Sequence, residues 1–91
     1  MAETWSVYLA RCADDSLYCG IARDVSARIA EHDAGTGARY TRGRGPLAVV
    51  ATRRFRSKSM ALRVEHAVKQ LTRTQKLAVT EDTLRRIARR V

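Results

Sequence analysis

The sequence predicts a small α+β domain, in which a three-stranded antiparallel sheet is flanked by helices in the order ββαβαα. Two segments rich in β-branched and aromatic residues come first and are separated by turn-forming residues. Apolar residues at helical spacing follow, interrupted by one further segment with strand-like alternation. A chain of 91 residues has room for one hydrophobic core, so we expect a single domain over residues 1–91.

The first two strands are expected at residues 5–12 and 17–22, joined as a hairpin by the turn-forming residues 14–16. If the turn has three residues, even-numbered residues of both strands lie on one face of the sheet. Tyr8 and Tyr18 then lie on the same side. The opposite side receives an apolar set that suits core packing: Val7, Leu9, Leu17, Cys19 and Ile21.

Asp24 is a good N-cap for a helix over residues 25–34, which the following glycines end. Arg28 and His32 are four residues apart, so they project from the same side of this helix. A basic loop at residues 38–46 then leads to the third strand.

The third strand is expected at residues 47–55, and the helix after it begins at Ser57 or Ser59. This helix has the clearest apolar periodicity in the chain, formed by Met60, Val64, Ala67, Val68 and Leu71. Glu65 falls at the border of that stripe, from where its carboxylate can point into a cleft.

A polar connection at residues 72–76 is expected to lead to a final helix over about residues 80–91, capped by Thr80. Its periodicity turns four apolar residues inward: Leu84, Ile87, Ala88 and Val91. Four arginines face outward: Arg85, Arg86, Arg89 and Arg90.

The charge of the chain points to a polyanionic partner. Eighteen Lys and Arg residues against nine Asp and Glu give a net charge of +9, and fifteen of the eighteen are Arg. Residues 39–76 hold eleven basic side chains and a single acidic one, Glu65. An uneven, Arg-rich charge of this kind favours contact with nucleic acid.

The sequence also argues against a membrane or secreted protein. It has no apolar run of the roughly 20 residues that a membrane span requires, and residues 1–7 lack the pattern of a secretory signal. Cys12 and Cys19 are placed on opposite faces of the hairpin, so we expect no disulfide and no metal–thiolate site. We therefore expect a cytoplasmic protein without a membrane partner.

Several spaced motifs occur together in one order: Val7-Tyr8-Leu9, Tyr18-Cys19-Gly20, Asp24-Val25-x-x-Arg28-x-x-x-His32, the loop from Gly37 to Arg44, and Ala61-Leu62-x-x-Glu65-x-x-x-Lys69. With these motifs the chain resembles the GIY-YIG nuclease domain over about residues 5–72. It looks closest to the small stand-alone, UPF0213-like subgroup of that family. The resemblance implies the GIY-YIG fold.

The resemblance also implies a metal-dependent endonuclease that hydrolyses phosphodiester bonds in DNA, in repair or recombination processing. It implies that Glu65 ligates a single Mg²⁺ or Mn²⁺, with no small-molecule cofactor, and that Arg28 contacts the scissile phosphate. Tyr8 and Tyr18 would position or deprotonate the attacking water, and which of them is the base stays open. His32 would orient the water or bind the leaving group.

Further residues are expected to contact nucleic acid, with DNA favoured over RNA. Gly20 would let the nucleic-acid backbone approach the sheet closely. In the basic loop, a tyrosine between arginines suits base stacking beside phosphate contacts. The expected contacts of the loop and of the later helix are Arg39, Tyr40, Arg42, Arg44 and Lys69.

Each of these residues also has a purely structural explanation. Tyrosines on a hairpin often pack against each other, Arg28 can pair with Asp24 or Glu31, and Glu65 can pair with Lys69. The alternative function is a non-catalytic DNA- or RNA-binding module that retains the nuclease cleft. Metal-dependent cleavage of DNA distinguishes the two functions.

Overall fold

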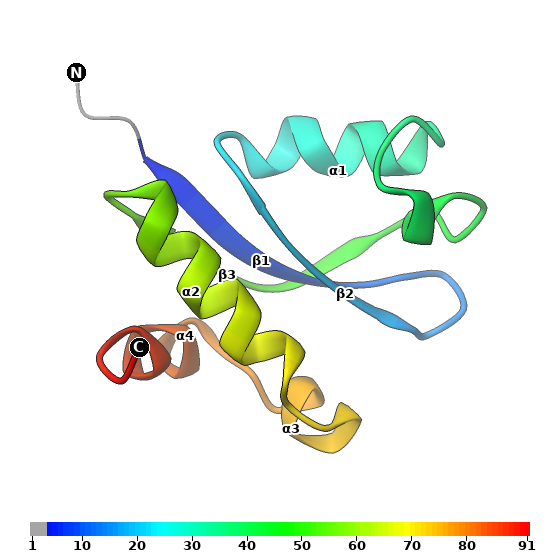
Figure 1. Cartoon of the computed structure of the whole chain (residues 1–91). Coiled ribbons are helices and arrows are strands. Elements are labelled where there is room, and N and C mark those ends of the chain that lie inside the picture. The colour runs from blue at the N-terminus through cyan, green and yellow to red at the C-terminus, as the bar shows by residue number, and fades with distance from the viewer. Residues whose placement is uncertain (1–3) are drawn as a thin grey trace.

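The computed structural model describes residues 4–91, so the first three residues of the predicted domain lie outside the described part of the chain. Three antiparallel strands form one sheet: β1 (Trp5–Arg11), β2 (Leu17–Ala22) and β3 (Ala48–Phe55). β1 lies between the other two, so β2 and β3 are edge strands. Helices flank the sheet, and the predicted α+β architecture is confirmed (Figure 1).

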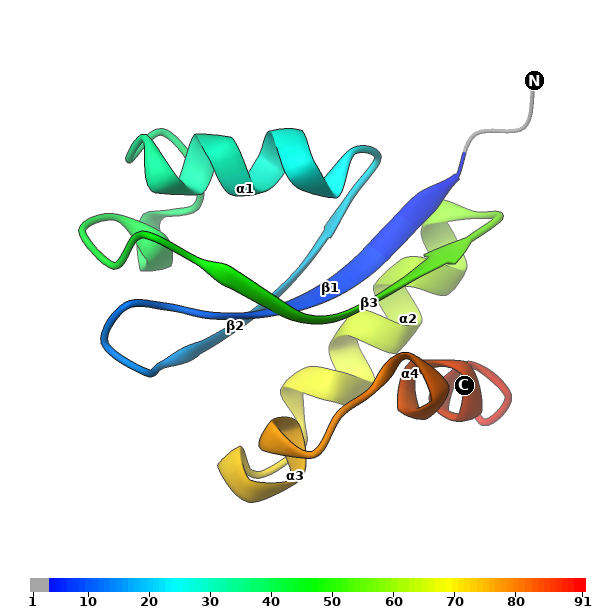
Figure 2. The same ribbon diagram turned by 180° about the vertical axis from the view of Figure 1, so that it is seen from behind.

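The helices divide between the two faces of the sheet. α1 (Val25–Asp33) covers the face that carries the even-numbered residues of β1 and β2. α2 (Lys58–Lys69) and α4 (Glu81–Ala88) pack on the opposite face, as the view from behind also shows (Figure 2). Within residues 4–91, every helix is too short or too polar to span a bilayer.

The helix starts follow the predicted capping residues. The Asp24 carboxylate accepts a hydrogen bond from the backbone N–H of Ala27 at 3.0 Å. Ser57, rather than Ser59, caps α2 by accepting from the N–H of Met60 at 3.1 Å. Side-chain acceptors at these positions satisfy N–H groups that the first helical turn leaves unpaired.

The hairpin keeps the predicted faces and the predicted three-residue turn, but the turn lies one residue earlier, at residues 13–15 instead of 14–16. Arg11, and not Ala13, pairs with Leu17, so the register moves by two residues. The N–H of Cys12 donates to the carbonyl of Ser16 at 2.8 Å, and Asp15 adopts a left-handed φ of 66°, which closes the turn. Because the register moves by an even number of residues, each side chain stays on its predicted face.

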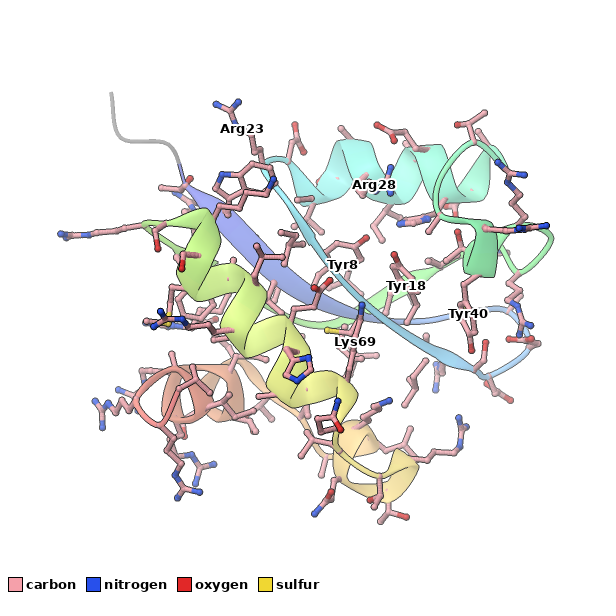
Figure 3. All side chains as sticks on the ribbon, viewed as in Figure 1. Tyr8, Tyr18, Arg23, Arg28, Tyr40 and Lys69 are labelled. Carbon is pink, nitrogen blue, oxygen red and sulfur yellow. The ribbon has the colours of Figure 1, made fainter. Side chains whose placement is uncertain are left out.

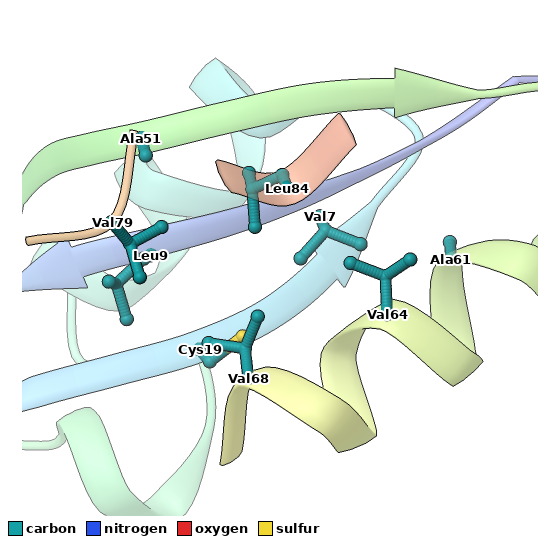
Figure 4. Close-up of a cluster of buried hydrophobic side chains, with 9 residues drawn as sticks. All are labelled: Val7, Leu9, Cys19, Ala51, Ala61, Val64, Val68, Val79 and Leu84. Atoms are coloured by element: carbon teal, nitrogen blue, oxygen red, sulfur yellow. The ribbon is translucent and has the colours of Figure 1, made fainter. Parts of the chain in front are cut away.

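The main core lies between the sheet and the helices α2 and α4 (Figure 4). Its buried members are Val7, Leu9, Cys19, Ala51, Ala61, Val64, Val68, Val79 and Leu84. A second buried cluster lies under α1 and consists of Tyr8, Ala10, Cys12, Ala22 and Leu47. Both cysteines are free and belong to different clusters, in agreement with the prediction.

Two details near the C-terminus differ from the prediction. The expected polar connection contains a short helix, α3 (Arg73–Leu77), because Thr72 and Gln75 form a reciprocal capping box. Val91 was expected to face inward and is 41% exposed, because α4 ends at Ala88 and the last residues leave the helical path.

Leu84 is fully buried and attaches α4 to the main core. Leu84→Ala should lower the free energy of unfolding by about 2–5 kcal/mol, since it removes buried methyl groups and leaves a cavity. Urea denaturation measures the loss. Leu62→Ala is the matched control, because Leu62 on α2 is 44% exposed. Equal losses in the two variants would contradict the described position of α4.

Candidate active site

Tyr8 lies on the central strand, faces α1 and is fully buried. Its hydroxyl lies 2.8 Å from Nε2 of His32 on α1. Burial raises the pKa of the Tyr8 phenol far above its usual range, and the nearby Arg28 only partly opposes this shift. Tyr8 is therefore a neutral phenol at physiological pH.

Hydrogen bonds from the following loop hold the His32 ring in place. Nδ1 of His32 lies 2.6 Å from the hydroxyl of Thr41, which belongs to the 3₁₀ turn η1 (Arg39–Thr41). The backbone N–H of Ala38 also donates to Nδ1, at 3.3 Å. Because Nε2 pairs with the Tyr8 hydroxyl, both ring nitrogens have a partner.

The His32 ring is held in its neutral form. It is 1% exposed, and burial, together with the positive charge of Arg28, lowers the pKa of His32. Partners on both ring nitrogens keep the neutral imidazole oriented, with Nε2 directed at the Tyr8 hydroxyl.

Two glycines provide the space that these rings occupy. A Cβ at Gly20 would lie 2.7 Å from the Tyr8 hydroxyl oxygen and 3.1 Å from Cε2 of Tyr18. A Cβ at Gly37 would collide with the His32 ring. Gly20 thus has a structural reason to be glycine, beside its predicted approach to a nucleic-acid backbone, which stays a prediction.

Tyr18 lies on the edge strand β2 and is only partly buried. Its ring meets His32 edge-on, with the centroids 5.1 Å apart, and stacks on Tyr40 with the centroids 5.8 Å apart. An open cavity of about 380 Å³ is lined by Tyr18, Tyr40 and Lys69 among others. Tyr18, and not the buried Tyr8, is therefore the tyrosine that a bound substrate can reach.

Arg28 projects from α1 on the side of the two tyrosines (Figure 3). Its Nη1 donates to Oε2 of Glu31 at 2.7 Å, and this hydrogen bond raises the pKa of Arg28. Glu31 is one of the two structural partners expected from the sequence. The guanidinium has five N–H donors and is 34% exposed, so it can hold Glu31 and an anion together.

Glu65 lies on α2, on the opposite side of β2 from α1, and its side chain is 17% exposed. Its Oε2 is 3.5 Å from Nζ of Lys69, so the expected structural pair is present. Burial and then the Glu65 charge raise the pKa of the Cys19 thiol to about 12, which indicates that the carboxylate lies close to Cys19. Lys69, the ion-pair partner of Glu65, lines the cavity beside Tyr18 and Cys19, so Glu65 lies near the free edge of β2, across it from the tyrosines.

The donor groups around Glu65 determine which kind of metal site this carboxylate can form. Within residues 4–91, no group of three or more His, Cys, Asp or Glu side chains could hold an ion. Mg²⁺ is often bound by one or two carboxylates together with waters and substrate phosphates. Glu65, as a single partly buried carboxylate at the strand edge, fits an ion of this kind and does not fit a cage of protein ligands.

The arginines of the predicted loop fall into two groups. Arg39 and Arg42 are exposed. Arg44 is engaged by the hairpin turn, because its Nη1 donates to Asp14 at 2.5 Å and its Cζ lies 4.6 Å from the centroid of the Tyr40 ring. Arg44 therefore holds the loop against the hairpin.

The structure brings all four predicted catalytic residues together on the α1 side of the sheet: Tyr8, Tyr18, Arg28 and His32. The predicted metal ligand, Glu65, lies across the strand edge. Sequence reasoning missed Thr41 and Gly37, which orient His32. Neither belongs to a periodic pattern, because their contacts depend on how the loop folds back on α1.

Comparison with known proteins agrees with this geometry. Residues 4–78 match the sequence model of the GIY-YIG catalytic domain. The UPF0213 protein of Natronomonas pharaonis is 50% identical over 82 residues, which cover 90% of this chain and 96% of that protein. The UPF0213 protein of Halobacterium salinarum is 51% identical over 73 residues, covering 80% and 95% of the two chains.

A solved structure is also similar. The solution NMR structure of a UPF0213 protein from Bacillus halodurans is 49% identical, with a TM-score of 0.51, and the match covers 80% of this chain and 78% of that one. The name UPF0213 states no activity, so the chemistry has to be argued from the site.

The buried His32 predicts a dependence of stability on pH. Because its pKa is lowered in the folded chain, the unfolded chain binds a proton more readily, so the free energy of unfolding should fall as the pH drops from about 7 to about 5. Urea denaturation across this range measures the effect. His66→Gln is the control, because His66 is exposed and its replacement should leave the pH dependence in place. A pH-independent stability of the unmodified protein would contradict the neutral buried imidazole.

Proposed function

Because the chain belongs to the GIY-YIG catalytic domain family, we propose that it is a metal-dependent endonuclease that hydrolyses phosphodiester bonds in DNA. The observation that carries the proposal is the grouping of two tyrosines, a neutral histidine and an arginine beside an edge strand, with a carboxylate across that edge. Tyr18, Arg28 and Glu65 supply a hydroxyl, an anion contact and a metal ligand, and the buried pair of Tyr8 and His32 lies beneath them.

In hydrolysis a water oxygen bonds to phosphorus while the bond to the leaving sugar oxygen breaks, and the proton that the water loses is balanced by the proton that the sugar oxygen gains. Tyr18 lines an open cavity, so we assign it to orient the attacking water. Tyr8 is buried and bonded to His32, so we assign it to hold the His32 ring beside Tyr18. This assignment separates the two tyrosines, whose roles the sequence left open.

Arg28 is the residue best suited to the scissile phosphate. Its planar fork can donate to two phosphoryl oxygens at once while Glu31 orients the other side of the guanidinium. Developing negative charge on those oxygens would then face a fixed positive group, which is worth more in the transition state than in the ground state.

Glu65 is proposed to hold a single Mg²⁺ or Mn²⁺. When bound, the ion would acidify a coordinated water and neutralise charge on the phosphate oxygens. A more acidic water is needed, because a tyrosine phenol, with a reference pKa of about 10, is mostly protonated at neutral pH and a poor acceptor for the proton of the water.

The exposed Arg39 and Arg42, together with Lys69, are proposed to contact backbone phosphates, and Tyr40 extends the aromatic surface beside Tyr18. Such contacts carry little sequence information, so we propose DNA cleavage without a strong sequence preference. A cytoplasmic role in repair or recombination processing follows from the family alone, which is an argument by analogy.

One observation favours a second function, a DNA- or RNA-binding module without turnover. Glu65 is paired with Lys69, whose ammonium group competes with a metal ion for the carboxylate. Incubation of the protein with supercoiled, single-stranded and branched DNA in the presence of Mg²⁺ or Mn²⁺ separates the functions. Metal-dependent cleavage supports the endonuclease, and a mobility shift without cleavage supports the binding module.

Glu65→Gln should abolish metal-dependent cleavage, because an amide keeps the shape of the side chain but is a poor metal ligand. The melting temperature should hardly change, since an i,i+4 pair with Lys69 is worth about 0.2–0.5 kcal/mol. Glu81→Gln is the matched control, because Glu81 is also a helical carboxylate paired with a cation, Arg53 at 3.2 Å. Full metal-dependent cleavage by Glu65→Gln would place the ion elsewhere.

Arg28→Lys should lower the cleavage rate by roughly 10²-fold or more, because it keeps the charge and loses the planar fork. Single-turnover cleavage at saturating metal measures the loss. Arg85→Lys is the control, because Arg85 also pairs with an acid three residues away, Asp82, on an exposed helix. Normal rates in both variants would remove Arg28 from the catalytic groups.

A further inference from the structure

Two positive side chains lie over the ring of Trp5, the first residue of β1. Nζ of Lys58 is 4.9 Å from the ring centroid, and Cζ of Arg23 is 6.0 Å from it. Lys58 begins α2 and Arg23 follows β2, so three separate segments meet at this indole. The negative face of the ring attracts the cations and holds them at the surface, where both are exposed.

An open cavity of about 350 Å³ lies at this place and is lined by Trp5, Arg23 and Arg28 among others. Arg28 also lies close enough to Tyr8 to influence the pKa of that phenol. The cavity therefore adjoins the candidate active site. Figure 3 shows Arg23 and Tyr40 at opposite ends of β2, with Arg28 and Tyr18 between them.

We propose that Trp5, Arg23 and Lys58 form a second phosphate-binding subsite, which holds the backbone of the DNA strand beyond the scissile phosphate, at the Arg23 end of β2. The proposal rests on the proposed function, since it takes the position of the scissile phosphate from Arg28. Phosphate is the expected ligand group, because two exposed cations on one indole ring offer charge and N–H donors. The strand would then follow the free edge of β2 from this subsite toward Tyr18 and Tyr40.

Trp5 is the single tryptophan of the chain and so reports directly on the proposed subsite. Metal-free protein is titrated with an oligothymidylate of about 12 nucleotides, a length within the usual range of single-strand sites. Trp5 emission should change over the same concentrations as the fluorescence anisotropy of the labelled oligonucleotide. Binding by anisotropy without a change in Trp5 emission, or no binding at all, would overturn the proposal.

The double variant Arg23→Gln, Lys58→Gln tests the charge contribution. Loss of two phosphate contacts should reduce the slope of log affinity against log salt by about 1.4. Arg89→Gln, Arg90→Gln is the matched control, because it removes two exposed arginines beyond α4 and should leave the slope unchanged. An unchanged slope in the first variant, or an equal change in both, would overturn the subsite.

The subsite and the proposed function can fail separately. Binding is measured without metal, so a protein that shows the Trp5 and salt effects but never cleaves DNA would retain the subsite and lose the endonuclease. If the protein cleaves DNA in the presence of metal but its Trp5 emission does not change when the oligonucleotide is added, the endonuclease function stands and the subsite is overturned.

Discussion

The hydrogen bond between the Tyr8 hydroxyl and Nε2 of His32 is the contact on which the candidate site depends. It joins the central strand to α1 inside a buried layer, where an unpaired phenol or imidazole would cost about 1–3 kcal/mol. Thr41 pairs the other ring nitrogen, and Gly20 leaves the space for the phenol. The ring of Tyr18 lies against both buried rings, so neutral groups form the floor of the site and charged groups form its rim.

The layers of the fold could be predicted because the strands and helices that form them show simple periods of apolar residues. Alternation along the first two strands separates the tyrosines from the core residues, and the even shift of register leaves that separation intact. Spacing by four residues placed Arg28 and His32 on one side of α1, where the structure also has them beside the tyrosines. The catalytic residues on this face could therefore be predicted from local periodicity, because each of them lies on a strand or a helix.

Two other features of the site could not be predicted from local periodicity. One depends on a contact between distant segments, and the other on which carboxylate pairs with Arg28. Thr41 reaches His32 only because the loop folds back on α1, which no local pattern encodes. The sequence left Asp24 and Glu31 as alternative partners for Arg28, and the structure decides between them. The Asp24 carboxylate is used by the helix cap, so Glu31 takes the guanidinium.

β2 is paired on one side only, so alternate N–H and C=O groups of its backbone point away from the sheet. An open edge of this kind invites pairing with a strand of another molecule, which proteins commonly prevent with short edge strands and charged side chains. β2 has six residues, and Arg28, Lys69 and Lys76 line the cavities along it. The basic groups that suit a phosphate backbone therefore also repel the same edge of a second copy, which keeps the strand open to a ligand without making it a point of aggregation.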